Sequence, residues 1–346
     1  MPVRHAIVIG GSTGALEALL RLLPGLRRDV QASVFVVIHT AASSPGVLPN
    51  ILARVCPLPV AYAVDGEQAR AGRVIVAPPD HHLLLEGPRV RVARGPRENG
   101  FRPAVDPLFR TAAVAYGKNA IGVVLSGGLS DGTFGLLQIK RNGGVAVVQD
   151  PDDALARSMP ESAIAHVDVN HVVAAASLGA LLMRLTKARK PSIRNRARRH
   201  APDAAEVGTN FLVSGPEPAE AVSAFTCQEC GGVLRIREDG GLTRFGCHVG
   251  HVYTEDALAA AQTSGLEHAL WTALRTLEEG AAFRRQMAAR AHDRGANGVG
   301  TQLDEQAAEW EARAATVRRA LVTDDATGDL GSEASVEHRA QRARRG

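Results

Sequence analysis

Short apolar runs alternate with amphipathic stretches over roughly the first 185 residues of the chain. The apolar runs predict β-strands at residues 5–9, 34–38, 60–63, 74–77, 121–125 and 145–148. Apolar positions at helical spacing predict helices at residues 16–23, 107–116, 132–141 and 178–187. Such alternation is typical of an α/β fold, here a doubly wound, mostly parallel sheet covered by helices on both faces. A polar insert at 82–94 predicts a small hairpin turning at Gly87-Pro88.

The C-terminal third has a different pattern, with two apolar stripes at helical spacing. The members of the first stripe are Leu266, Leu270, Leu274, Leu277 and Ala281, and those of the second are Leu303, Ala307, Trp310, Ala314, Val317 and Leu321. Residues 292–300 between them contain three glycines, which indicates a turn. We therefore expect an antiparallel helical hairpin. Its stripes would pack on each other, and they are also compatible with self-association or with binding of a signalling partner.

The first predicted strand runs directly into Gly10-Gly11-Ser12-Thr13-Gly14, and a helical pattern follows. This is G-x-S-x-G in a strand-turn-helix context, which is typical of a nucleophile turn. Glycines allow the sharp reversal and leave Ser12 accessible at a helix N-terminus, where free backbone N–H groups favour a developing oxyanion. The alternative interpretation is the phosphate-binding turn of a nucleotide-binding regulatory module.

Two other loops favour the nucleophile over the nucleotide site. The strand at 34–38 ends in His39, where a ribose-binding site would carry an acidic residue. The strand at 121–125 leads into a glycine-rich loop that contains Asp131. Loops at the carboxyl ends of parallel strands meet at one edge of the sheet, so Ser12, His39 and Asp131 can converge although they are far apart in sequence.

Residues 5 to about 185 resemble the catalytic domain of the CheB-type chemotaxis protein-glutamate methylesterases. The resemblance rests on Gly10 to Gly14, His39, Asp65-Gly66-Glu67, Ile75 to Pro78 with His82, Arg102-Pro103 with Val105 to Phe109, Ser126 to Gly132, Gln149-Asp150-Pro151 and Met159-Pro160. It implies that Ser12 is the nucleophile, His39 the general base and Asp131 the residue that orients His39. It also implies hydrolysis of glutamate γ-methyl esters on the cytoplasmic helices of methylated chemoreceptors, with no catalytic cofactor. It allows deamidation of receptor glutamine by the same machinery.

Three further residues are expected beside the triad. Thr13 and Gly128 are candidates for the oxyanion site, where family members usually carry Met at the position of Gly128. Arg102 is a candidate for binding substrate, with a structural ion pair as the alternative. Asp106 is expected to cap the helix that follows it.

A second motif consists of Cys227-x-x-Cys230 and, after sixteen intervening residues, Cys247-x-x-x-His251. Two ligand pairs on tight turns joined by a short hairpin suit tetrahedral zinc. A disulfide is disfavoured in a reducing compartment and would leave one of the three thiols unpaired. We prefer His251 to His248, because adjacent Cys and His side chains do not easily reach the same ion. Four protein ligands leave no open position, so the zinc would be structural.

Composition and charge complete the prediction of a cytoplasmic protein. The net charge is +4, and no apolar stretch approaches the roughly 20 residues of a membrane span. The early apolar run is too short for a signal peptide. Seven Lys or Arg in residues 187–199 indicate a solvated linker rather than a nucleic-acid site.

The predicted organisation has five parts. They are a catalytic domain (1–186), a basic flexible linker (187–222), a zinc-ribbon-like module (223–254), the helical hairpin (255–322) and a disordered tail (323–346). Because the first strand starts at about His5, we expect no receiver domain of the kind that family members commonly carry before the catalytic domain. Switching by phosphorylation within the chain is therefore not expected. The remaining alternative is a catalytically weak scaffold that acts through its zinc-helical part.

Overall fold

The computed structural model describes residues 5–188 and 221–327 of the 346-residue chain. It divides into two compact units, Met1–Ala259 and Ala260–Gly346. Most of the predicted linker and the end of the predicted tail, residues 189–220 and 328–346, lie outside the described residues. Among the described helices, none combines the length and the apolar character needed to cross a lipid bilayer.

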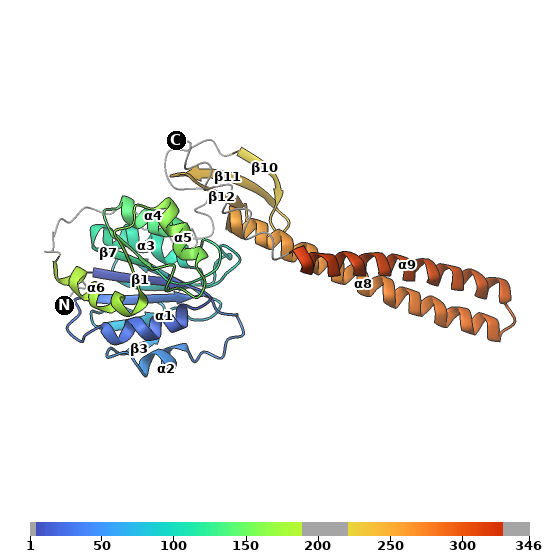
Figure 1. Ribbon diagram of the computed structural model, residues 1–346, viewed down its shortest axis with the longest axis horizontal. Helices are drawn as coiled ribbons and strands as arrows, with labels where there is room; N and C mark the ends of the chain where they lie inside the picture. Colours follow the sequence, from blue (N-terminus) through green and yellow to red (C-terminus); the bar gives the residue numbers. More distant parts are fainter. Residues whose placement is uncertain (1–4, 189–220, 328–346) are drawn as a thin grey trace. The chain divides into compact units, whose positions relative to one another are not determined.

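A seven-stranded sheet forms the centre of the first unit (Figure 1). Its strands are β1 (His5–Gly11), β2 (Ala32–Ile38), β3 (Val60–Tyr62), β4 (Arg73–Val76), β7 (Ala120–Val124), β8 (Val145–Gln149) and β9 (His171–Val173). Their order is β3-β4-β2-β1-β7-β8-β9, and every neighbouring pair is parallel. The predicted α/β class with a parallel sheet is confirmed.

Helices cover both faces of this sheet. They are α1 (Ala15–Leu22), α2 (Leu48–Ala53), α3 (Val105–Tyr116), α4 (Thr133–Arg141), α5 (Ser158–His166) and α6 (Ala175–Ala188), with short 3₁₀ turns at Leu23–Gly25 and Gly117–Asn119. Alternate residues of β1 belong to separate cores: Ile7 and Ile9 pack with α1 and α6, whereas Ala6 and Val8 pack with α3 and α4. The near-continuous apolar strands are therefore buried on both sides, as parallel sheets require.

Three helices and strands of the parallel-sheet part were missed by the sequence patterns. Strand β9 has only three residues, and none of them is fully buried. Helix α2 has six residues and a proline in its first turn, and α5 carries little amphipathic contrast along Ser158–His166. Short elements of this kind form because the sheet and its neighbours hold them, so local periodicity gives little signal.

The predicted hairpin at 82–94 forms as β5 (His82–Glu86) and β6 (Arg89–Ala93), with Gly87 and Pro88 as its two-residue turn. Leu83 and Leu85 of this hairpin are buried in the core beside α3.

The Cys/His module, residues 221–254, is an antiparallel sheet within the same unit. Its strands are β10 (Ala221–Thr226), β11 (Val233–Asp239), β12 (Leu242–Cys247) and β13 (Val252–Thr254), in that order across the sheet. The module contacts the helices of the parallel sheet directly. Asp239 pairs with Arg141 of α4, and the guanidinium of Arg244 lies over the ring of Phe134, 4.1 Å from its centroid.

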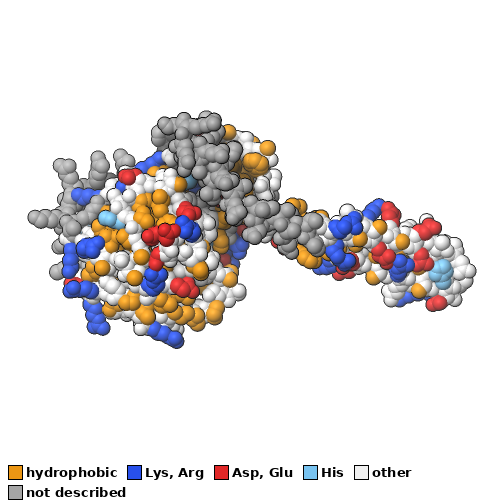
Figure 2. Space-filling view, in the orientation of Figure 1, with side chains coloured by type: hydrophobic (Ala, Val, Ile, Leu, Met, Phe, Trp, Pro, Cys, Tyr) orange, Lys and Arg blue, Asp and Glu red, His pale blue; other side chains and the backbone are white. Residues whose placement is uncertain are grey.

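The second unit is an antiparallel helical hairpin formed by α8 (Glu255–Asp293), which begins in the first unit, and α9 (Asn297–Thr327). Leu274, Ala314 and Leu321 form its small core. Figure 2 shows acidic and basic side chains interspersed along the hairpin surface. Arg285 of α8 and Glu311 of α9 form an ion pair at 2.9 Å, which links the two helices.

Two predicted boundaries and one predicted core residue require correction. Helix α6 extends to Ala188 and β10 begins at Ala221, so the linker is shorter than 187–222. Among the described residues, helix α9 continues to Thr327, past the predicted end near residue 322. Leu266 belongs to the predicted apolar stripe but is 55 % exposed.

We expect Gly10→Ala to destabilise the first unit by about 1–3 kcal/mol, because the added methyl group would overlap the Val105 side chain of the buried α3 helix. Gly95→Ala is the matched control, since its methyl group would meet only His82 at an ordinary 3.8 Å. Urea unfolding of both variants measures the difference. Equal midpoints for the two would show that Val105 moves aside at no cost.

Candidate active site

Ser12 occupies the turn between β1 and α1, at the carboxyl edge of the sheet. Its backbone N–H donates to the Ser126 carbonyl at 2.9 Å, which ties this turn to the loop after β7. Gly14 has a backbone φ of 79°, a left-handed conformation that residues with a side chain rarely adopt, so glycine is required where the turn enters the helix. The strand, the turn and the neighbouring loop together present the Ser12 side chain at the sheet edge.

His39 follows β2, and its imidazole is almost fully buried with 4 % of the side chain exposed. The ring Nε2 forms a hydrogen bond of 2.7 Å with Asp131 Oδ2. Phe101 stacks on the ring, with the two centroids 3.7 Å apart and the planes at 12°. Within the described part of the chain, the other ring nitrogen, Nδ1, has no hydrogen-bond partner. The Phe101 ring and the Asp131 carboxylate thus fix the imidazole, and Nδ1 is left without a hydrogen-bond partner.

The carboxylate of Asp131 lies at the N-terminus of α3. Its Oδ2 accepts the Val105 N–H at 2.6 Å, and its Oδ1 accepts the Asp106 N–H at 3.1 Å and the Asn99 amide at 3.0 Å. Burial alone would raise the pKa of Asp131, but the hydrogen bonds from His39 and from these backbone groups outweigh it and lower that pKa. Asp131 is therefore held as an anion beside the imidazole.

Asp106 does not cap its own helix. The cap residue is Ala104, and the Asp106 carboxylate accepts the N–H of Gly135 in α4 at 2.7 Å. The carboxylate that fills the capping role at this helix is Asp131, which comes from another loop. Burial, followed by the charge of Asp131, raises the pKa of Asp106 to about 7.

A pocket of about 390 Å³ opens beside these groups. Its lining residues are Ser12, His39, Thr40, Ala41, Ala42, Arg97, Gly100, Phe101 and Arg102. The guanidinium of Arg102 is engaged by Asp80 Oδ1, at 2.6 and 2.9 Å, and by the Gly95 carbonyl at 2.6 Å. Arg102 thus forms the ion pair that was the alternative to substrate binding, while still contributing to the pocket wall.

Thr13 follows Ser12 in the same turn, and Gly128 lies in the loop after β7. Among the described residues, no group accepts a hydrogen bond from the backbone N–H of Thr13 or Gly128. A Cβ at Gly128 would meet nothing within 4 Å. Both N–H groups are consequently available to an incoming oxygen.

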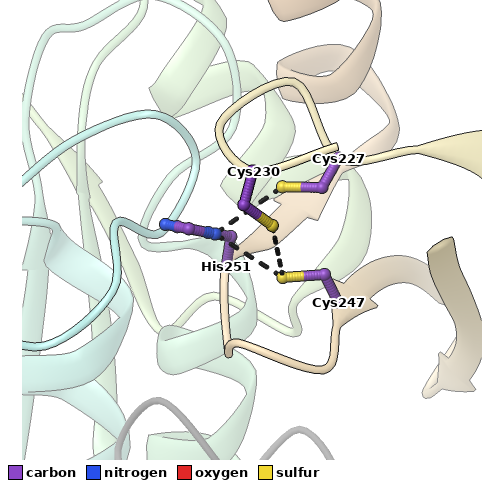
Figure 3. Close-up of side chains that lie close together, drawn as sticks. All are labelled: Cys227, Cys230, Cys247 and His251. Carbon is purple, nitrogen blue, oxygen red and sulfur yellow. Dashed lines mark hydrogen bonds between the residues drawn. The ribbon is translucent and has the colours of Figure 1, made fainter. Parts of the chain in front are cut away.

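The second predicted cluster is also assembled. Figure 3 shows the Cys227, Cys230, Cys247 and His251 side chains pointing toward one another. Their candidate ligand atoms all lie within 4.8 Å of one another. Cys230 and Cys247 sulfurs are 3.7 Å apart, and His251 Nδ1 is 3.5 and 3.6 Å from the sulfurs of Cys247 and Cys227. His248 is exposed and lies outside the cluster.

This donor set fits zinc. A tetrahedral ion with zinc–sulfur bonds of about 2.3 Å places its sulfur ligands about 3.8 Å apart, close to the separation observed for Cys230 and Cys247. No disulfide links the described cysteines. Three thiols and one imidazole would hold the ion without leaving a position for substrate.

Three residues around the site were missed by the sequence analysis. Phe101, which stacks on His39, and Asn99, which donates to Asp131, lie next to the Arg102-Pro103 motif, and Glu98 is buried beside them. Glu98 and Asn99 lie in an irregular segment, so the periodicity that indicates helices and strands gives no signal for them. The unusual positive φ of 54° at Asn99 is visible only in the structure.

The chain combines a parallel α/β sheet, a serine in the turn after β1, a buried histidine-aspartate pair and a pocket at the same edge of the sheet. This arrangement is typical of hydrolases with an α/β fold. Within that class, the family model described as CheB methylesterase matches residues 7–182, about half of the chain. The chain belongs to the CheB methylesterase family.

Similar proteins agree with this assignment. A putative protein-glutamate methylesterase/protein-glutamine glutaminase of Leptospira interrogans is 41 % identical over 182 residues, which are 52 % of this chain and 94 % of the relative. A relative with the same two activities in its name, from Pyrococcus horikoshii, is 33 % identical over 50 % of this chain and 48 % of its own length. The crystal structure of the Thermotoga maritima CheB methylesterase catalytic domain matches with a TM-score of 0.50 and 31 % identity, covering 52 % of this chain and 98 % of that one.

We expect Asp106→Asn to become more stable relative to the parent protein as pH rises from about 4 to about 7. The folded protein retains the Asp106 proton in this range, whereas the unfolded chain loses it. Rising pH therefore favours the unfolded state of the parent and lowers its free energy of unfolding, an effect that asparagine, with no proton to lose, does not show. The asparagine oxygen can still accept the Gly135 N–H. Urea unfolding at several pH values measures the difference, with Asp168→Asn, at an exposed position, as control. A difference that does not change with pH would contradict the raised pKa.

Proposed function

We propose that this protein hydrolyses glutamate γ-methyl esters on chemoreceptor helices, by acyl transfer to Ser12. The observation that carries the proposal is the buried hydrogen bond of 2.7 Å between His39 and Asp131, beside a pocket that Ser12 also lines. Family membership and the names of the relatives support the substrate class. The relatives' second named activity, on protein glutamine, uses the same acyl-transfer chemistry with ammonia as the leaving group.

In the proposed mechanism His39 is the general base. Its Nε2 is occupied by Asp131, so Nδ1 is the nitrogen that remains to take the Ser12 proton. Ser12 Oγ then attacks the ester carbonyl carbon, and His39 returns the proton to the departing methoxide, which leaves as methanol. Water, deprotonated in turn by His39, hydrolyses the acyl-enzyme and restores Ser12.

The oxyanion of each tetrahedral intermediate would be bound by backbone N–H groups. Thr13 stands at the start of the turn into α1, and Gly128 stands in the loop after β7. Their unengaged N–H groups and the N-terminal end of α1 favour negative charge at this point. The Arg102 guanidinium is already paired with Asp80. Arg102 would therefore affect the substrate by forming part of the pocket wall.

The two alternative functions have weaker support. A nucleotide-binding turn would need an acidic residue after β2, whereas His39 stands there and bonds to Asp131. A catalytically weak scaffold would not need a carboxylate that holds a histidine beside an open pocket lined by Ser12.

We propose a structural zinc ion at Cys227, Cys230, Cys247 and His251. The Cys/His module has few large buried apolar side chains, so an ion bound between its two turns would supply part of its folding free energy. The zinc would take no part in the acyl transfer.

The helical hairpin is proposed as the region for self-association or for a signalling partner. Trp271 and Phe283 of α8 are 55 % and 60 % exposed, although both are large apolar side chains.

Ser12→Ala is expected to lower methyl-ester hydrolysis by roughly 10⁴-fold or more while leaving the fold intact. Methanol released from methylated receptor measures the activity, and circular dichroism checks the fold. Ser177→Ala, at an exposed position on α6, is the control and should keep full activity. Turnover by Ser12→Ala comparable with the parent would exclude Ser12 as the nucleophile.

Freshly purified, reduced protein should contain about one zinc per chain by elemental analysis. His251→Ala should lose the ion, because this substitution removes one of four ligands. His248→Ala should retain it, because that side chain is exposed and outside the cluster. If His248→Ala lost the zinc and His251→Ala retained it, His248 would be the fourth ligand in place of His251. Absence of zinc from the parent protein would refute the proposed site.

A further inference from the structure

One short segment, residues 97–101, contacts both members of the buried histidine-aspartate pair. Phe101 stacks on the His39 ring, and the Asn99 amide nitrogen donates to Asp131 Oδ1 at 3.0 Å. Asn99 is 6 % exposed, and its φ of 54° is the left-handed conformation that asparagine tolerates better than most residues. The orientation of the imidazole and of its carboxylate therefore depends on where this segment is held.

Residues 97–101 also form hydrogen bonds with the Cys/His module. The Asn99 backbone N–H donates to the Val252 carbonyl at 2.7 Å, and the Thr254 N–H donates to Asn99 Oδ1 at 2.9 Å. The Thr254 hydroxyl accepts a hydrogen bond of 2.9 Å from Ser130, the residue before Asp131. Strand β13 thus pairs with residues 97–99 as if they were its neighbour in a sheet, and the single side chain of Asn99 bridges β13 and Asp131.

A buried ion cluster joins the same two parts. Glu98 is 1 % exposed and forms a two-pronged ion pair with Arg110 of α3, at 2.7 and 2.8 Å. Arg244 of β12 approaches Glu98 at 3.6 Å and is itself buried. The module therefore supplies one of the positive charges that compensate the buried carboxylates next to the active site.

The proposed metal ligands adjoin these contacts in sequence. Cys247 ends β12, His251 immediately precedes β13, and Gly246 pairs with Val252 across the two strands. A change in the loop between Cys247 and His251 must therefore move β13, which holds Asn99.

We propose that β13 and residues 97–101 form one positioning element for the His39–Asp131 pair, with Asn99 as its positioning residue. The Cys/His module is then part of the active-site scaffold and not an independent appendage. This inference rests on the proposed hydrolase function for its kinetic readout. The coupling runs from the Cys247–His251 loop through β13 and Asn99 to Asp131.

Two substitutions at Asn99, made in the full chain, separate positioning from simple packing. Asn99→Asp keeps an oxygen for the Thr254 N–H but loses the donor to Asp131, and Asn99→Gly removes both while tolerating the positive φ. We expect both to lower kcat by roughly 10²-fold with KM for methylated receptor little changed, as for a misplaced catalytic group. Asn142→Gly, at an exposed helix end, is the matched control and should leave kcat unchanged.

A spectroscopic readout accompanies the kinetics. The downfield proton resonance of the imidazole N–H that faces Asp131 should shift or disappear in both Asn99 variants and persist in Asn142→Gly. His251→Ala should show the same loss of this resonance, because β13 is released when the adjacent ligand is removed. Asn99→Asp with parental kcat and an unchanged resonance would overturn the proposal, whatever the behaviour of Asn99→Gly. His251→Ala with an unchanged resonance would overturn the coupling to the module.

Failure of the proposed function gives a different result. A parent protein that shows the downfield resonance but neither releases methanol nor reacts with a fluorophosphonate at Ser12 would refute hydrolysis. The resonance would still report whether Asn99 and His251 control the histidine-aspartate geometry.

Discussion

The buried carboxylate of Asp131 is the group on which the active site depends. A buried anion is costly unless hydrogen bonds satisfy it, and each oxygen of Asp131 has two donors. His39 and the Val105 N–H share Oδ2, whereas the Asp106 N–H and the Asn99 amide share Oδ1. Those donors come from the loop after β2, the start of α3 and the segment that precedes it. The hydrogen bonds to this one carboxylate therefore fix three parts of the fold relative to one another.

The charges around Asp131 follow from the same requirement. Three carboxylates, Glu98, Asp106 and Asp131, are buried near two guanidinium groups, those of Arg110 and Arg244. Glu98 takes the direct ion pairs, and Asp131 is stabilised as an anion by His39 and the helix N-terminus. Asp106 is left with the raised pKa, because burial and the neighbouring charge of Asp131 both disfavour its ionised form. Two carboxylates at one helix start thus have pKa values shifted in opposite directions.

The extension beyond the family domain bears on this cluster. The family model ends at residue 182, but Arg244, Val252 and Thr254 of the Cys/His module contact Glu98 and Asn99. The module therefore packs on Asn99, which hydrogen-bonds Asp131, and on the neighbouring Glu98. A zinc ion at the Cys227–His251 cluster would stabilise the turns that flank β12 and β13, and with them the surface that meets Asn99. The proposed metal and the proposed chemistry are linked through packing and not through the reaction.

The sequence by itself determined those features that local residue patterns encode. Apolar runs gave the six strands that were predicted, the G-x-S-x-G turn gave Ser12, and the ends of two further strands gave His39 and Asp131. Cysteine spacing gave the four residues that the structure gathers into one cluster. Tertiary structure alone decided the partners: Phe101 on His39, Asn99 between β13 and Asp131, and Asp131 in place of Asp106 at the start of α3. These contacts join residues up to 155 positions apart, and no local period or spacing specifies which distant group will satisfy a buried polar atom.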